Sequence, residues 1–243
     1  DLATNFLKDN YIDLGIRPAR KTYEHKVFLQ FDEKPNISLS INNKEFKYYT
    51  DYIAYNNGPD TSFSDTEIIY VGYGIDHKNY NSYDGLDVKD KVVLAIAGEP
   101  KNRRGNYLIN GGKKKSEWST RNEIARKKEA AAKNGAKALV LINNNLFNRY
   151  SNEYRISDNN MGEKRMSLAS NMTNEKIQVL LFAEKNKNYL LQKNRKFMNF
   201  SFDKNYNKFS ANNIAALIKG SEYPDEYIVI TAHLDHVGIQ NGV

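Results

Sequence analysis

The sequence predicts an α/β protein. Two continuous apolar runs, KVVLAIAG (91–98) and AKALVLINN (136–144), have the composition of strands that are covered on both faces. The segment between them, 120–135, carries the signals of a helix. The order strand, helix, strand is typical of a local α/β unit.

The N-terminal part of the chain predicts a helix followed by a hairpin. Apolar residues recur at near-helical spacing in 2–14, Gly15 stands where a C-terminal cap would, and Pro18 follows. Apolar and polar residues alternate in ISLSI (37–41), and the alternation resumes in EFKYY (45–49) after a pair of asparagines. Asparagine tolerates the left-handed conformation of a tight turn, so these segments are expected to pair.

Glycines and capping signals mark the central elements. EIIYVGYGI (67–75) is a short, mostly apolar run and predicts a strand. In the central helix, Thr120 and Glu123 have the spacing of a capping box, and an alanine run favours helix. We expect this helix to end at Gly135, because glycine favours the C-terminal cap.

The second half of the chain is expected to contain a loop, a helix and further strands. The segment 143–170 is rich in Asn, Ser and Arg and predicts a loop. The apolar residues of 174–192 predict a helix, and a polar stretch follows at 193–210. The runs 212–220 and 226–236 predict strands that are joined by a turn.

The composition indicates a globular protein without disulfides. The chain has 243 residues, 40% of them hydrophobic, and no apolar run long enough to span a membrane. Cysteine is absent, which excludes disulfides, thiolate metal ligands and a cysteine nucleophile. The chain begins at Asp1 and not at methionine, which fits a mature or trimmed product.

The net charge of +7 comes from one part of the chain. Between Lys101 and Lys128 there are ten basic residues and two acidic ones. The whole chain has 36 basic and 29 acidic residues, so the rest of the chain has 26 basic and 27 acidic residues and is nearly balanced. A nucleic-acid site would interleave aromatic residues with such a stretch, but only Tyr107 and Trp118 are present. We interpret the stretch as a solvated basic loop with Trp118 as a packing residue, and expect no nucleic-acid partner; an anion or nucleic-acid site is the alternative.

The histidines include one candidate metal ligand. In a strand over 226–236, His233 and Asp235 point to the same face and His236 to the other. An imidazole at the end of a strand can bind zinc while a nearby carboxylate accepts its other ring proton and orients it. The pattern alone also allows a simple hydrogen bond between His233 and Asp235. His25 and His77 stand alone, without acidic partners at ligand spacing.

The C-terminal segment resembles a known family over its strand-forming residues. NIAALIKG (213–220) and IVITAHLDHVG (228–238) are similar to the entry of the zinc aminopeptidase family, which includes bacterial leucyl aminopeptidases, aminopeptidase Y and glutamate carboxypeptidase II relatives. The resemblance implies His233 as a zinc ligand and Asp235 as the catalytic carboxylate that orients it. It also implies two Zn²⁺ ions, a metal-bound water as nucleophile and a peptide substrate.

The middle of the chain resembles the protease-associated domain that is inserted into many of these peptidases. YVGYGI (70–75), DVKDKVVLAIAG (87–98) and RKKEAAAKNGAKALVLIN (126–143) follow the order of that domain. The resemblance implies a partial zinc-exopeptidase domain with an open mixed sheet, interrupted by a small β-rich α+β insert. The expected division is an N-terminal peptidase part at 1–62, the insert at 63–205, and the first peptidase core strands at 206–243.

The resemblance also sets an expectation about activity. The family's remaining ligands lie downstream of the histidine strand, whereas only seven residues follow His236, none of them acidic or histidine. We therefore expect the 243-residue chain to be a C-terminally truncated, inactive part of a zinc metallo-aminopeptidase that is secreted, periplasmic or held in the cell envelope. The alternative is a non-catalytic module, built on the protease-associated domain, that binds a peptide or protein.

Overall fold

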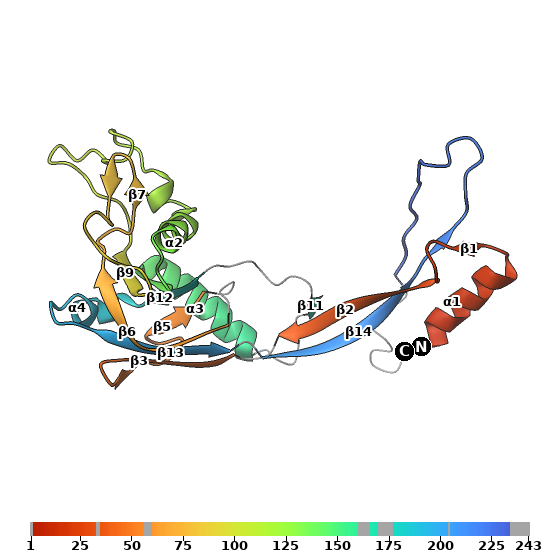
Figure 1. The fold of residues 1–243 in the computed structure, drawn as a ribbon, viewed down its shortest axis with the longest axis horizontal. Helices are drawn as coiled ribbons and strands as arrows, with labels where there is room; N and C mark the ends of the chain where they lie inside the picture. The colour runs from red at the N-terminus through yellow and green to blue at the C-terminus, as the bar shows by residue number, and fades with distance from the viewer. Residues whose placement is uncertain are drawn as a thin grey trace. The chain divides into compact units, whose positions relative to one another are not determined.

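The chain divides into two compact units, which are described separately. The computed structural model describes residues 2–32, 35–55, 60–159, 166–169, 177–203 and 205–233. Unit 1 consists of residues 1–31, 166–171 and 207–243, and unit 2 of residues 32–165 and 172–206. Figure 1 labels the elements of both units. The predicted boundaries at 62/63 and 205/206 mark where an inserted domain would begin and end. The division into compact units is a different property, so these boundaries remain a prediction.

Unit 1 is built from one helix and short β-sheets. Its elements are α1 (Leu2–Asp13), β1 (Arg17–Pro18), β2 (Glu24–Asp32), β11 (Met166–Leu168), β14 (Tyr206–Ile214) and β15 (Ala216–Leu217). A three-stranded sheet has the order β11-β2-β14, and β1 pairs antiparallel with β15. The predicted strand at 212–220 therefore exists only as the end of β14 and the short β15, with a break between them.

The predicted N-terminal helix is confirmed as α1. Gly15 follows it with φ 67°, the left-handed conformation that terminates helices at little cost for glycine. Thr4 is the buried residue of this helix, whereas Leu2 is 91% exposed and Phe6 is exposed as well. The described residues therefore leave the apolar side chains of α1 largely uncovered.

Unit 2 contains an open, mixed sheet of eight strands. The order is β4-β3-β13-β6-β9-β10-β12-β5, in which β6, β9, β10 and β12 are parallel and the outer strands pair antiparallel. The strands are β3 (Asn36–Ile41), β4 (Lys44–Glu45), β5 (Tyr52–Ala54), β6 (Thr61–Tyr70), β9 (Val92–Ile96), β10 (Ala138–Ile142), β12 (Gln178–Phe182) and β13 (Phe197–Asp203). The remaining elements are β7 (Asp76–His77), β8 (Tyr80–Asn81), η1 (Glu117–Ser119), α2 (Glu123–Lys133), α3 (Asn144–Asn159), η2 (Glu184–Asn186) and α4 (Lys187–Leu190).

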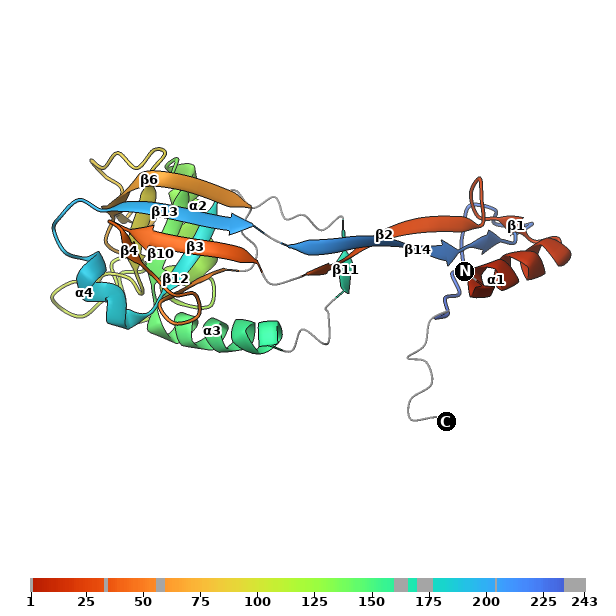
Figure 2. The same cartoon turned by 90° about the horizontal axis from the view of Figure 1, so that it is seen from below.

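Both faces of β9 and β10 are buried, as their continuous apolar runs predict. On β9, Val93 and Ala95 belong to a core that includes residues of α2 and α3, while Val92 and Leu94 face the opposite side. On that opposite side, residues of β3 and β13 cover the same strands, because the sheet curls over itself (Figure 2). The prediction of an α/β protein is confirmed. The open mixed sheet is present, but it was predicted for the zinc-exopeptidase part, whereas several of its strands come from 63–205.

Two local predictions are explained by positive backbone φ angles. The hairpin forms between β3 and β4, and Asn42 and Asn43 at its turn have φ angles of 47° and 65°. The predicted strand 67–75 ends at Tyr70, before Gly74, which has φ 66°. A Cβ atom at Gly74 would lie 2.9 Å from the Ala95 Cβ atom, so the turn after β6 requires glycine there.

Two predictions for the second half of the chain are wrong in whole or in part, and one stretch without a predicted element contains strands. The segment predicted as a loop contains α3. Most residues of α3 are polar, but Leu146, Phe147 and Tyr150 form an apolar face that packs against the core. The segment predicted as a helix, 174–192, contains β12, because a short apolar run fits a buried strand as well as a helix. Its end is helical, in η2 and α4, so the prediction holds only there. The polar stretch 193–210 contains β13 and most of β14, and β13 alternates between buried and more exposed residues.

The central helix is α2, but its N-terminus differs from the prediction. The N-cap is Asn122, which makes no side-chain capping hydrogen bond, so the capping box predicted for Thr120 and Glu123 does not form. The Glu123 side chain turns into the protein instead, as described below. Gly135 follows the helix with φ 82°, as expected. In the part of the chain that the structure describes, no helix combines the length and apolar character needed to cross a membrane.

Candidate functional site

His233 lies at the end of an exposed apolar segment in unit 1. Residues 226–233 have no regular secondary structure, so the strand predicted at 226–236 is wrong for this part. A β-strand needs a hydrogen-bonded partner strand, and none pairs with 226–233 among the described residues. Ile228 and Ile230 are 95% and 91% exposed, and His233 itself is exposed. Asp235 and His236 lie outside the described residues.

The described residues do not by themselves form a zinc site. Zinc sites in proteins take three or four protein ligands, and no group of three or more His, Asp or Glu residues within the described ranges could hold a metal ion. His233 is in unit 1, as is His25 on β2, whereas His77 lies on β7 in unit 2. The exposed imidazole of His233 alone does not make a zinc site within the described residues.

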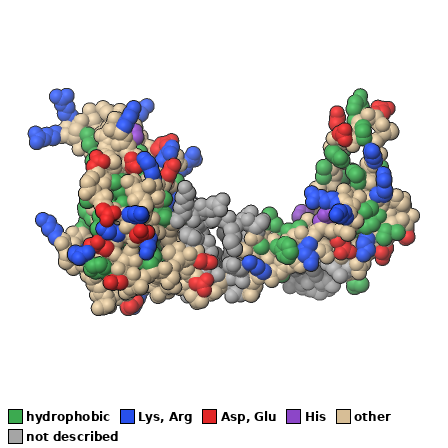
Figure 3. Space-filling view, viewed as in Figure 1, with side chains coloured by type: hydrophobic (Ala, Val, Ile, Leu, Met, Phe, Trp, Pro, Cys, Tyr) green, Lys and Arg blue, Asp and Glu red, His purple; other side chains and the backbone are tan. Residues whose placement is uncertain are grey.

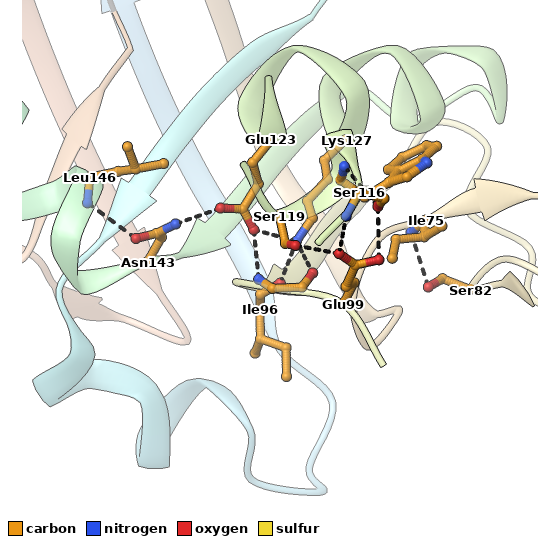
Figure 4. A network of polar contacts seen from close by, with 12 residues as sticks. Ile75, Ser82, Ile96, Glu99, Ser116, Ser119, Glu123, Lys127, Asn143 and Leu146 are labelled. Atoms are coloured by element: carbon orange, nitrogen blue, oxygen red, sulfur yellow. Dashed lines mark hydrogen bonds and ion pairs between the residues drawn. The ribbon is translucent and has the colours of Figure 1, made fainter. Parts of the chain in front are cut away.

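A buried polar network, which the sequence did not predict, lies at the carboxyl ends of β9 and β10 (Figure 4). Its centre is Glu123, the first residue of α2. The Glu123 carboxylate accepts hydrogen bonds from the Gly98 backbone N–H at 2.7 Å, from the Lys127 ammonium at 2.7 Å and from the Asn143 amide at 2.8 Å. The carboxylate thereby joins α2 to the segments that follow both strands.

Lys127 is the cation of this network, and its side chain is 0% exposed. Besides Glu123, its ammonium donates to the backbone carbonyls of Ile96 at 2.8 Å and Gly98 at 3.0 Å, so its three N–H groups are all used. Burial lowers the pKa of Lys127, and the charge of Glu123 acts in the opposite direction. A lysine without these partners would be costly to bury in its charged form.

A second buried carboxylate, Glu99, holds the loop that precedes α2. It accepts hydrogen bonds from the Ser116 backbone N–H at 2.7 Å, from the Ser116 hydroxyl at 2.8 Å and from the Ser119 hydroxyl. The Ser116 hydroxyl also accepts from the Trp118 backbone N–H at 3.2 Å, which caps η1. The network thus fixes the path of the chain between β9 and α2.

The described partners of Glu123 and Lys127 suit a structural role. They are backbone groups, the Asn143 amide and each other. The sequence did contain a signal for it. Glu123 and Lys127 stand at i and i+4 on the same helix stripe as Ile124 and Ala131, which are buried. A charged pair on an apolar stripe indicates a buried ion pair.

Two cavities of unit 2 border the network. One of about 480 Å³ includes Ser116 in its lining, and one of about 750 Å³ includes Glu123 and Asn143. Both volumes fall within the range of small-molecule sites.

The basic stretch 101–128 is only partly a solvated loop. Lys127 is buried, and the Arg126 guanidinium binds the Glu117 carboxylate through its Nε atom at 2.8 Å. Lys and Arg side chains gather on the surface of unit 2 around β7 (Figure 3, upper left). Trp118 is partly buried against the core that includes α2, as the prediction of a packing residue requires.

Comparisons with known proteins give distant similarities to solved structures. No protein-family profile matches the chain. No curated protein matches it either.

Three of the similar solved structures are an aminopeptidase from Aneurinibacillus sp. strain AM-1, a peptidase M28 precursor from Shewanella amazonensis SB2B, and BSAP, a zinc aminopeptidase from Bacillus subtilis. Their identities to this chain are 14%, 16% and 14%, with TM-scores of 0.41, 0.36 and 0.39. The alignments cover 90%, 96% and 91% of this chain but 42%, 48% and 41% of those proteins, so the chain spans less than half of their length. Similarities at these TM-scores are too low to establish a shared fold or function.

Proposed function

We propose that residues 1–243 belong to a zinc-dependent metallopeptidase of the aminopeptidase type, in which His233 binds zinc and Asp235 orients its imidazole. The observation that carries this proposal is the segment IVITAHLDHVG (228–238), which directly follows NIAALIKG (213–220) and the intervening turn. An imidazole and a carboxylate two residues apart suit a ligand and its orienting partner. The proposal includes two Zn²⁺ ions, a peptide substrate, and a location outside the cytoplasm or in the cell envelope.

The exposure of the segment before His233 supports the proposal. Ile228, Val229 and Ile230 are large apolar side chains, and all three are mostly exposed in the described part of the chain. Contiguous exposed apolar residues of this kind are typical of surfaces that another part of a protein covers. Residues 226–233 form no strand in the described chain, and we propose that 206–243 supplies the first core strands of the peptidase domain only when the rest of that domain pairs with it. We also propose that 63–205 is an inserted protease-associated domain.

The complete gene product provides the test. We expect it to hydrolyse leucine p-nitroanilide, to lose this activity in EDTA and to regain it when zinc is restored. His233→Ala should abolish the activity, and Asp235→Asn should lower it about 10–100-fold, the usual cost of losing a ligand's hydrogen-bonding partner.

A matched control is Glu226→Gln, which changes an exposed carboxylate in the same segment and should leave the activity unchanged. EDTA-resistant hydrolysis, or full activity of His233→Ala, would contradict the proposal. A folded complete protein that hydrolyses no peptide would favour the non-catalytic binding module instead.

A further inference from the structure

The smaller of the two cavities is formed by three neighbouring parts of unit 2. Its volume is about 480 Å³, which suits a ligand of one to a few residues in size. The lining comes from β7, from the loop before η1 together with η1, and from α2. The lining residues are His77, Ile109, Asn110, Lys115, Ser116, Glu117, Trp118 and Arg126.

Hydrogen-bond donors line this cavity and have no protein acceptors. The Asn79 backbone N–H donates to His77 Nδ1 at 3.2 Å, so the neutral imidazole carries its proton on Nε2. Lys115 contributes an ammonium group and Trp118 an indole N–H. Within the described ranges, no hydrogen-bond acceptor is found for His77 Nε2, Lys115 Nζ or Trp118 Nε1.

Some acceptors of the lining are already used by protein donors. Glu117 supplies the carboxylate of the lining, and it binds Arg126 through both Nε and Nη2. The Ser116 hydroxyl donates to Glu99 and accepts from the Trp118 backbone N–H. Among the described residues, the donors of the lining outnumber its unused acceptors, Asn110 Oδ1 and Glu117 Oε1. Its charged residues are two cations, Lys115 and Arg126, and one anion, Glu117, so the cavity favours a ligand that brings acceptor oxygens and negative charge.

The lining also contains an apolar part. Ile109 is buried and contributes an aliphatic surface, and Trp118 contributes an indole ring. Apolar lining with a few convergent polar groups is the usual composition of a small-molecule site. An inorganic anion such as phosphate has no apolar group to contact this surface.

We propose that the cavity between β7, η1 and α2 binds a small carboxylate that carries an apolar group, of the chemical class of an N-acylated amino acid. The carboxylate pairs with Lys115 and accepts from His77 Nε2, while the apolar group lies against Ile109 and Trp118. Two sources share this chemistry, a free N-acyl amino acid and the C-terminal residue of a peptide. The site does not depend on the proposed peptidase activity.

Trp118 makes the proposal directly measurable, because it is the single tryptophan of the 243-residue chain. Because Trp118 also lines the cavity, its fluorescence can report on a ligand that binds there. Titration with N-acetyl-leucine should give a saturable change in emission, and N-acetyl-leucinamide, which lacks the charge, should bind at least about tenfold more weakly. Sodium phosphate alone should give no saturable change.

Two lysine variants separate the cavity from the general basic surface. Lys115→Gln should weaken N-acetyl-leucine binding about tenfold, because it removes the charged donor. Lys114→Gln, an exposed neighbour outside the lining, should leave it unchanged. N-acetyl-Gly-Gly-Leu distinguishes the sources. Binding as tight as that of N-acetyl-leucine identifies a peptide C-terminus, and much weaker binding identifies a free small molecule.

Four results would overturn the proposal, and the first three concern N-acetyl-leucine and the two variants. They are the absence of any saturable response to N-acetyl-leucine, equal affinities for the acid and its amide, and equal effects of Lys115→Gln and Lys114→Gln. Tight binding of phosphate would also overturn it, because it would make the cavity a general anion site. Circular dichroism of both variants checks that the chain remains folded.

Discussion

At the scale of single residues, the ion pair of Lys127 with Glu123 is the feature with the largest expected effect on stability. Replacing Lys127 by Met leaves the Glu123 carboxylate buried with fewer partners and removes a donor from two backbone carbonyls. Breaking a buried pair from one side costs about 3–5 kcal/mol, so we expect Lys127→Met to lower the free energy of unfolding by about that amount. Urea-induced unfolding measures it.

Lys133 gives the matched control on the same helix. It also pairs with one carboxylate, that of Asp76 at 2.9 Å, but its side chain is 71% exposed. Exposed ion pairs contribute roughly 0.2–1 kcal/mol, so Lys133→Met should cost less than about 1 kcal/mol. Similar losses for the two variants would contradict the structural role of the buried network.

Asp76 predicts a dependence of stability on acid. The hydrogen bond from Lys133 holds the pKa of Asp76 below its usual range, and the Asn134 amide, which donates at 3.1 Å, acts in the same direction. A lowered pKa in the folded state stabilises the protein above the unfolded pKa of about 3.9 and loses this contribution as the pH falls through the folded value. The stability advantage of the wild type over Asp76→Asn should therefore be present at pH 7 and shrink below about pH 4. An advantage that stays constant from pH 7 to pH 2 would contradict this account.

At the scale of elements, the sequence correctly predicted the helices and strands whose residue pattern fits a single type of secondary structure. The runs of β9 and β10 are apolar throughout and are buried on both faces. The turn of the β3–β4 hairpin follows from its asparagines, because few other residues adopt positive φ. The residues of these elements themselves, and not contacts with distant segments, make their structure predictable.

The errors arose where tertiary contacts decide the structure. A five-residue apolar run such as β12 is too short to show a period, and only its parallel pairing with β10 makes it a strand. The strand predicted for 226–233 has no partner within the described chain, which is a property of the fold and not of its own residues. The buried network was missed because Glu123 also fits a capping box.

The helix α3 can be tested by a single substitution. Asn152 lies on its exposed side within the helix Asn144–Asn159. Proline inside a helix costs about 3 kcal/mol or more, whereas alanine favours helix, so Asn152→Pro should destabilise unit 2 and Asn152→Ala should not. Free energies of unfolding within about 0.5 kcal/mol of each other for the two variants would indicate a loop, as the sequence alone suggested.

At the scale of the whole molecule, the 243-residue chain should be inactive as a peptidase. Within the described residues, no group of three or more His, Asp or Glu side chains could hold a metal ion. We expect the purified chain to release no p-nitroaniline from leucine p-nitroanilide above the rate of the buffer. EDTA-sensitive release by the purified chain would contradict this expectation.

The central claim is that His233 binds zinc in the complete protein, and the zinc content of that protein tests it most directly. Elemental analysis of the purified complete gene product should find about two zinc ions per chain, and His233→Ala should retain fewer. Asp235→Asn should retain zinc more weakly, by about 10–100-fold in affinity. A complete, folded protein without zinc, or a His233→Ala variant with the same zinc content as the wild type, would contradict the account.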